Sequence, residues 1–297
     1  VSSLWSHSSP LISCAVHSNL LASAFALISA VLIAVGTVWR HRILRAGQSR
    51  SEANTAPLKS LSNLNWWLSM GIAFVAYVFQ AAALAFGSLL VVQPILVLSL
   101  MLTLLLSSRV ERMPMSRAEG LWAVVLTASV AVVVVVGHPL PGTREVAARE
   151  WVAVIVLGIL VTAGAFAFAS RRPAATKALT YGLTCGAIYG YLAVFAKVAM
   201  DVLTHRGWLA MLASWQFWAV IATAVAGIVV QQYAFGAGDL ATSLPANKVA
   251  EPMVALALGY TLLGEEFDVG GWGLALMGAS ISIMLLSAVK LTRASLR

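Results

Sequence analysis

The chain has 297 residues, of which 60% are hydrophobic and only 10% are charged. Globular domains carry about 25% charged residues, so this composition excludes a soluble globular protein and indicates a polytopic membrane protein. The formal charge of +8 does not indicate a nucleic-acid binder, because most basic residues lie in short segments beside apolar runs, where they set membrane topology.

Several apolar runs are long enough to be membrane spans. A helix needs about 20 residues to cross a hydrocarbon core of about 30 Å. The first run lacks a preceding basic segment, which indicates a retained anchor rather than a cleaved signal peptide. We predict an all-α polytopic membrane protein of nine transmembrane helices, at 20–39, 66–86, 89–106, 120–137, 151–169, 177–200, 213–236, 244–263 and 271–288.

The basic residues predict the orientation of these spans. Fourteen of the nineteen Lys and Arg residues lie in alternate connections and the C-terminal tail, at 40–65, 107–119, 170–177 and 289–297. Three lie in the opposite set, at 138–150 and 201–212. Because cytoplasmic loops are enriched in Lys and Arg, we expect the N-terminus outside and the C-terminus in the cytoplasm, at the plasma (inner) membrane of a bacterium.

The two halves of the chain carry a weak internal repeat. An offset of 151 residues places Gln80, Gly87 and Pro94 on Gln231, Gly238 and Pro245, and an offset of 158 places Pro94 on Pro252. The matching spans are five apart, so the two copies are antiparallel, as in the inverted repeats of secondary transporters. The predicted layout is an external tail (1–19), a first repeat of four helices (20–137), a linking helix region (138–176), a second repeat of four helices (177–290) and a basic cytoplasmic tail (291–297).

The eighth predicted span carries polar residues that are rare at membrane depth. Asn247, Lys248 and Glu251 lie between Pro245 and Pro252. An ionisable side chain in a transmembrane helix costs about 2.5–3.5 kcal/mol on insertion scales and marks a functional site by default. Glu251 is therefore the first candidate for binding a cation or a coupling proton. The alternative is a neutralising pair with Lys248, three residues earlier on the same helical face.

Residues 238–265 resemble the drug/metabolite transporter superfamily, in its EamA-like branch. The resemblance rests on Gly238-Asp239-Leu240, Leu244-Pro245, Glu251-Pro252 and Leu262-Leu263-Gly264-Glu265, with an echo in Gly87-Ser88-Leu89 and Gln93-Pro94. It implies an inverted-repeat helical bundle that transports small solutes. The usual plan of that superfamily has ten spans, and the polar stretch at 40–65 leaves nine here. A nine-span plan is more similar to the NIPA-type magnesium transporters.

Other side chains in the matching helices are candidates for a translocation path. Gln80, Gln93, Gln231 and Gln232 either line this path or bond one helix to another, and Tyr189 and Tyr191 could shape a ligand pocket. We expect helix breaks or hinges at Gly87, Pro94, Gly238, Pro245 and Pro252.

Three further features have plainer interpretations. Gly182, Gly186 and Gly190 recur every four residues, which indicates close helix packing. Lys197 is expected to extend to the membrane surface. Glu265, Glu266 and Asp268 form an external acidic cluster that could attract cations, but a solvated loop is the simpler expectation.

The sequence predicts a secondary transporter, acting as an exporter of a small metabolite or drug-like solute, by alternating access around Glu251 at the repeat interface. Coupling to protons or another ion and homo-oligomerisation stay open. The first alternative is a NIPA-like transporter of magnesium or another divalent cation; the second is a non-transporting membrane partner protein. We expect no enzyme, no cofactor and no metal centre, because no nucleophile–base pair or His/Asp cluster shares one depth.

Overall fold

The computed structural model describes residues 10–48, 64–110, 116–140, 142, 146–236 and 240–294. The described chain is almost entirely helical. The helices are α1 (Pro10–Gln48), α3 (Leu64–Phe86), α4 (Leu89–Val110), α5 (Arg117–Ala131), the π-helical η1 (Val132–Val136), α6 (Ala148–Ser170), α7 (Ala174–Arg206), α8 (Trp208–Ala213), α9 (Trp215–Gly236), α10 (Leu240–Thr261) and α11 (Trp272–Ala294).

The expected fold class is confirmed at the level of an all-α membrane protein. Each of the predicted spans falls on one of these helices, with α5 and η1 forming one continuous run. Within the described residues, six helical runs are long and apolar enough to cross a membrane: those of α1, α4, α5 with η1, α6, α7 and α11. Helices α3 and α9 contain shorter apolar stretches, Gly71–Phe86 and Trp215–Gln231. The total of nine transmembrane helices therefore stays a prediction.

Some structure was not expected from the sequence. A short antiparallel ladder joins β1 (Pro139–Leu140) to β2 (Glu266–Phe267), and the six-residue helix α8 precedes α9. Helix α1 continues past the predicted span to Gln48, and α11 continues to Ala294, so the first residues of the predicted basic tail are helical.

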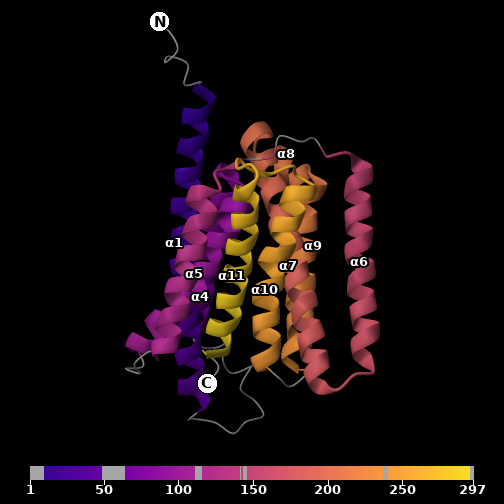
Figure 1. Ribbon diagram of the computed structural model, residues 1–297. Coiled ribbons are helices and arrows are strands. Elements are labelled where there is room, and N and C mark those ends of the chain that lie inside the picture. Colours follow the sequence, from indigo (N-terminus) through magenta and orange to yellow (C-terminus); the bar gives the residue numbers. More distant parts are fainter. Residues whose placement is uncertain are drawn as a thin grey trace, which may run out of the picture.

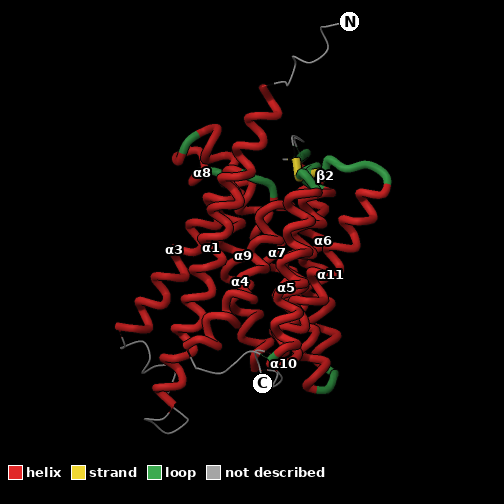
Figure 2. Tube along the Cα trace, turned by 60° about the vertical axis from the view of Figure 1, so that its left-hand side comes forward, coloured by secondary structure: helices red, strands yellow, loops and turns green. Residues whose placement is uncertain are grey.

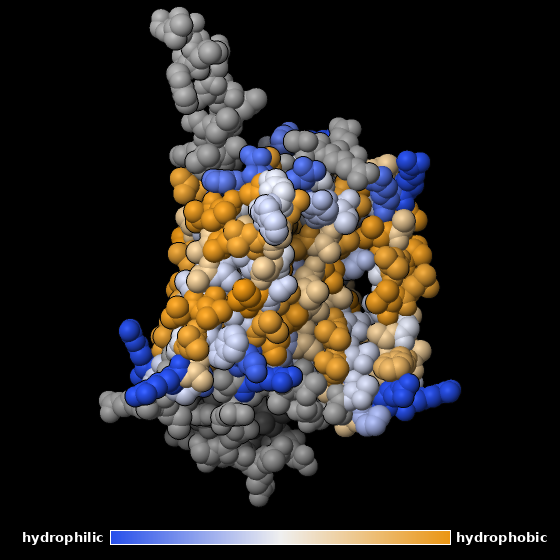
Figure 3. Space-filling model, in the orientation of Figure 1, coloured by the Kyte–Doolittle hydropathy of each residue, from blue (hydrophilic) through white to orange (hydrophobic). Residues whose placement is uncertain are grey.

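The helices run alongside one another as a bundle (Figures 1 and 2). Helix α1 packs against α3 and α4, while α7 packs against α9 and α10. Helix α10 also contacts α4, α9 and α11, which makes it central. Helix α6 stands at the side of the bundle, mainly against α7 (Figure 1). An apolar belt separates two ends that carry hydrophilic side chains (Figure 3), as expected of a surface that faces lipid.

The helix starts follow the offset of the predicted repeat. Helices α3 and α9 begin at Leu64 and Trp215, and α4 and α10 begin at Leu89 and Leu240. Both pairs are 151 residues apart. Pro94 and Pro245 are each the sixth residue of their helix.

Small residues bring the backbones of α7 and α10 together, as the glycine spacing predicted. A Cβ atom at Gly182 would collide with the backbone of Ser243, one at Gly186 with Asn247 O, and one at Gly190 with Val254. In α1 a comparable row of alanines is completely or almost completely buried: Ala22, Ala26, Ala30 and Ala34. Small residues therefore let α1 and α7 pack closely against neighbouring helices.

Candidate functional site

The middle of α10 holds the residues that the sequence singled out first. Asn247 is buried, whereas Lys248 and Glu251 are half-buried. Their helix is held against α7 by the glycine contacts, with Gly186 beside Asn247 and Gly190 beside Glu251 O. Among the ion pairs of the described residues, none joins Lys248 to Glu251. Both charged groups are thus at mid-helix, without the neutralising pair considered above.

Two amide side chains, one on α4 and one on α10, are buried with an unused polar atom. Gln93 on α4 is 2% exposed and Asn247 on α10 is 5% exposed. Within the described chain, Gln93 Nε2 and Asn247 Oδ1 have no hydrogen-bond partner. The same holds for Ser243 Oγ, one turn before Asn247. A buried polar atom without a partner costs about 1–3 kcal/mol, so such atoms are suited to a polar ligand or water.

Tyr189 connects the glutamine of α9 to this region. Its hydroxyl donates to Gln231 Oε1 at 3.3 Å, and its ring covers Gly227. The next residue of α7, Gly190, lies against Glu251 O on α10. The structure thus brings Tyr189 and Gln231 into direct contact from α7 and α9, one residue away from the contact of α7 with Glu251.

The other predicted site residues lie elsewhere. The Tyr191 hydroxyl donates to Val154 O on α6 at 3.0 Å, away from this group. Gln80 is half-buried on α3. The side chain of Gln232 and the whole of Gly238 lie outside the described residues.

Of the predicted breaks, Gly87 coincides with the change from α3 to α4. A Cβ atom there would collide with Ala22 Cβ on α1, so the close approach requires glycine. Helix α4 continues through Pro94, and α10 continues through Pro245 and Pro252.

The expectation of a solvated Glu265 is wrong. Its side chain is 0% exposed, and Oε1 and Oε2 accept the Leu89 and Leu90 N–H groups at 2.9 and 3.1 Å. Glu265 therefore caps the start of α4, where unpaired N–H groups and the helix dipole favour an anion. Burial raises the pKa of Glu265 to about 7; the two N–H groups and Lys197 lower it, and Asp201 raises it.

A glycine brings Glu265 to this position. Gly264 has φ +68°, in the left-handed region that glycine favours. The turn lets Glu265 N–H donate to Gly259 O at 3.0 Å, so the chain folds back over the end of α10. This sequence, Leu262-Leu263-Gly264-Glu265, already contributed to the family resemblance, which was the available signal that Glu265 is not an ordinary loop residue.

Lys197 is also buried, at 7% exposure, so the expectation that it extends to the membrane surface is wrong. Its ammonium group donates to Leu84 O at 2.9 Å and to Asp201 Oδ1 at 2.8 Å. A buried lysine needs such partners, because desolvation would otherwise favour its neutral form.

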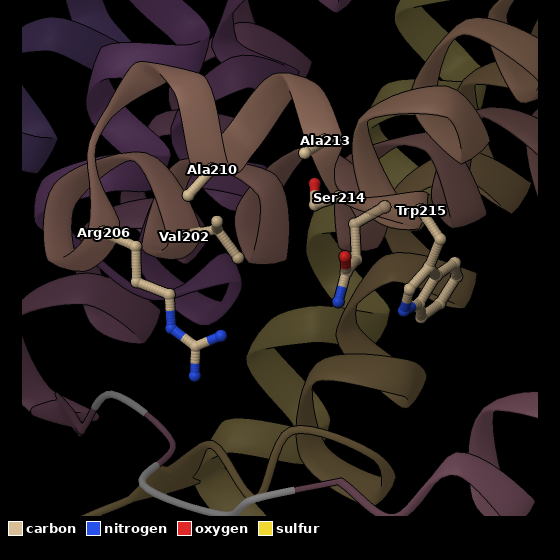
Figure 4. A pocket seen from close by; sticks show the side chains of 7 residues that line it. Val202, Arg206, Ala210, Ala213, Ser214 and Trp215 are labelled. Atoms are coloured by element: carbon tan, nitrogen blue, oxygen red, sulfur yellow. The ribbon is translucent and has the colours of Figure 1, made fainter.

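A cleft of about 600 Å³ lies between the end of α7, α8 and the start of α9 (Figure 4). Arg206, Ser214, Trp215 and Gln216 supply the polar and aromatic part of its lining. The cleft contains none of the predicted site residues, and it lies at the same end of the bundle as Asp201. Among the described residues, no three His, Cys, Asp or Glu side chains form a group that could hold a metal ion.

Comparison with known proteins gives a family but no activity. No family model matches the chain, and no solved structure matches it. An uncharacterized protein of Corynebacterium glutamicum is 44% identical over 281 residues, which cover 94% of this chain and 97% of that protein. Because the similarity extends over nearly the full length of both proteins, the chain belongs to the same family as this uncharacterized corynebacterial protein.

Proposed function

We propose that the protein is a secondary transporter that exports a small polar solute by alternating access. The observation that carries the proposal is the set of polar groups on α10: half-buried Lys248 and Glu251 beside buried Asn247. Helix α10 contacts α4, α7, α9 and α11, so these groups lie inside the bundle's contact network. Ionisable residues at such positions are retained in membrane proteins chiefly for ion or substrate binding.

The packing supports nine spans that cross in alternating directions, and the basic residues of the connections support an external N-terminus. The connections predicted to lie outside meet at one end of the bundle. Asn19 Nδ2 donates to Pro139 O, β1 pairs with β2, and Glu265 reaches the α3–α4 connection. If successive helices cross the membrane in alternating directions, these connections come to lie on the same side.

The matched helix starts support an inverted repeat. Helix α1 with α3 and α4 would correspond to α7 with α9 and α10, and α5 to α11. Helices α4 and α10 are antiparallel, since Leu89 at the start of α4 lies beside Gly259 near the end of α10. In transporters of this plan the substrate binds near the bilayer midplane between the two repeats. This is also the plan of the drug/metabolite transporters that the sequence resembles.

The unused polar atoms indicate the kind of solute. Gln93 Nε2 can donate a hydrogen bond, and Asn247 Oδ1 can accept one. Glu251 and Lys248 add one charge of each sign. A small metabolite with both donors and acceptors, such as an amino acid or a sugar derivative, suits this set. The proposed location is the plasma membrane of a bacterium.

The test is solute-dependent stabilisation followed by transport. The purified wild type is heated with amino acids, sugar nucleotides, lipid-linked sugars or magnesium chloride, because a ligand that binds the native state raises the apparent Tm. A stabilising solute is then added to proteoliposomes that contain a pH-sensitive dye. We expect an organic solute to raise the Tm and to change the lumenal pH.

Two variants make the test specific. Glu251→Gln should lose the Tm response and the pH change, while Glu266→Gln, which alters an exposed glutamate in β2, should keep both. Stabilisation by magnesium alone would replace this proposal with divalent-cation transport. If no compound is transported and Glu251→Gln responds like the wild type, the proposal fails and a non-transporting membrane partner becomes the better interpretation.

A further inference from the structure

The short helix α8 presents apolar side chains at the end of the bundle where α7 finishes. All six of its residues are apolar, and Trp208, Leu209 and Leu212 are exposed. Trp218 of α9 is also exposed, and its indole N–H donates to Leu212 O at 3.2 Å. Tryptophan at the end of a transmembrane helix is typical of the headgroup level of a bilayer. Helix α8 therefore has the composition of a segment that lies at this level.

The cleft of about 600 Å³ is bounded by another face of the same helix. Ala210 and Ala213 of α8 and Val202 of α7 form the apolar part of its lining. Among the described residues that line it, Arg206 supplies the one charged side chain, and none is an Asp or a Glu. Arg206 and Trp215 extend from opposite sides of this space (Figure 4). The cleft thus combines a single positive charge with apolar walls.

Three aromatic rings fix the wall that Trp215 forms. The centroid of its ring is 5.2 Å from that of Trp151 on α6 and 5.9 Å from that of Phe195 on α7. The rings of Trp151 and Phe195 are 5.7 Å apart. Aromatic rings at these distances attract one another, so each restricts the movement of the other two. The exposed Trp215 is therefore a preformed surface on which a ligand can rest.

Two polar side chains of the cleft are available to a ligand. The Ser214 hydroxyl is not one of them, because it donates to Met211 O within its own turn at 2.6 Å. Within the described chain, the Arg206 guanidinium has no ion-pair partner and the Gln216 amide has no hydrogen-bond partner. Arginine binds phosphate oxygens with two parallel N–H groups, and a glutamine amide both donates and accepts.

We propose that this cleft binds the headgroup of an anionic phospholipid, with the phosphate on Arg206 and the ester region beside Gln216. A lipid fits better than a soluble anion because the exposed apolar surface continues from the cleft along α9, through Trp218, Ile221 and Val225. These residues are three and four positions apart, so they share one helical face that can receive an acyl chain. The inference rests on the membrane location alone and is independent of the transport function proposed above.

The first arm of the test compares the binding of two lipids. Phosphatidylglycerol, which is anionic, and phosphatidylcholine, which has no net charge, are titrated into the detergent-purified protein, and native mass spectrometry counts the bound lipids. We expect the wild type to bind phosphatidylglycerol about ten-fold more tightly, the factor that a hydrogen bond to a charged group contributes. Arg206→Gln should bind both lipids alike, and since Arg206 is exposed and unpaired within the described chain, the change should not disturb the fold.

Arg149→Gln is the matched control for charge. Arg149 is exposed near the start of α6, two residues before Trp151, and it does not line the cleft. Removing it takes one positive charge from the same end of the bundle, so a general attraction of anions would weaken equally in both variants. We expect Arg149→Gln to keep the wild-type preference. An equal loss in the two variants, or an unchanged preference in Arg206→Gln, would overturn the proposal.

The second arm tests the cleft itself and the nature of the occupant. Ala213→Phe fills the cleft without altering Arg206 and should weaken the binding of phosphatidylglycerol several-fold, whereas Ala153→Phe, at an exposed position of α6, should not. Glycerol 3-phosphate, which carries the phosphate without acyl chains, should not displace the lipid at millimolar concentration. Displacement by glycerol 3-phosphate would mean a site for a soluble anion, and unchanged binding by Ala213→Phe would mean that the lipid binds elsewhere; either result refutes the proposal.

Discussion

At the scale of single residues, the buried Glu265 should make the stability of the protein depend on pH. The folded state holds its proton up to a pKa of about 7, while the unfolded chain releases it near 4.5. Between these values the folded state binds more protons, so the free energy of unfolding falls as pH rises and is constant above 7. The shift corresponds to about 3 kcal/mol at most.

The measurement is the apparent Tm of the wild type and of Glu265→Gln over this pH range. We expect the Tm of the wild type to fall relative to that of Glu265→Gln as pH rises, because glutamine does not titrate. Other titrating groups cancel in the difference. A difference that is independent of pH would contradict the raised pKa, and Glu266→Gln should parallel the wild type.

The sequence indicates a polar residue inside an apolar run, but it does not indicate a burial that depends on tertiary contacts. Asn247 and Glu251 could be found from the sequence, since polar side chains are conspicuous inside an apolar run. Glu265 was marked only by the Leu262-Leu263-Gly264-Glu265 motif of the family resemblance, because in every other respect an acid after a predicted span resembles any loop residue. Its burial depends on the turn at Gly264 and on a contact with the start of α4. Leu90, in that first turn of α4, lies 175 positions before Glu265 in the chain.

At the scale of helices, the contact between α7 and α10 should be sensitive to any added side chain. A Cβ atom at Gly186 meets Asn247 O and Ala250 Cβ. Gly186→Val should therefore push α10 away and lower stability by about 1–3 kcal/mol, the usual cost of overpacking. The apparent Tm in detergent measures this effect.

The matched control is Gly278→Val on α11, where an added Cβ atom has no neighbour within 4 Å. Gly278→Val changes the helix propensity in the same way as Gly186→Val, but its side chain meets no neighbouring helix. We expect its Tm to stay close to that of the wild type. Equal losses in the two variants would mean that propensity, and not packing against α10, explains the effect.

Helix positions followed from the sequence more closely than helix lengths did. Apolar runs and the glycine spacing were sufficient for the existence of the helices and for the close packing of α7. The extension of α1 to Gln48 and the short α8 were missed. The extension of α1 is rich in polar residues, which continue a helix as readily as they end it. Helix α8 is apolar, but its six residues are too few to be recognised as a span.

At the scale of the whole molecule, the predicted orientation depends on the distribution of Lys and Arg between the two ends of the bundle. Three positions report on it. Ser116 and Ala174 lie at the starts of α5 and α7, beside basic connections, and Leu209 lies on α8 at the opposite end. All three are exposed or lie in exposed turns, so a cysteine there should not disturb packing.

In a background with Cys14→Ser, which leaves only the buried Cys185, a membrane-impermeant maleimide should label Leu209→Cys on intact cells. Ser116→Cys and Ala174→Cys should react only after permeabilisation, because the positive-inside rule retains their basic neighbours in the cytoplasm. The reverse pattern would invert the transporter and place Glu265 at its inner end. Labelling of Ala174→Cys and Leu209→Cys from the same side would mean that α7 does not cross, and the inverted repeat could not exist.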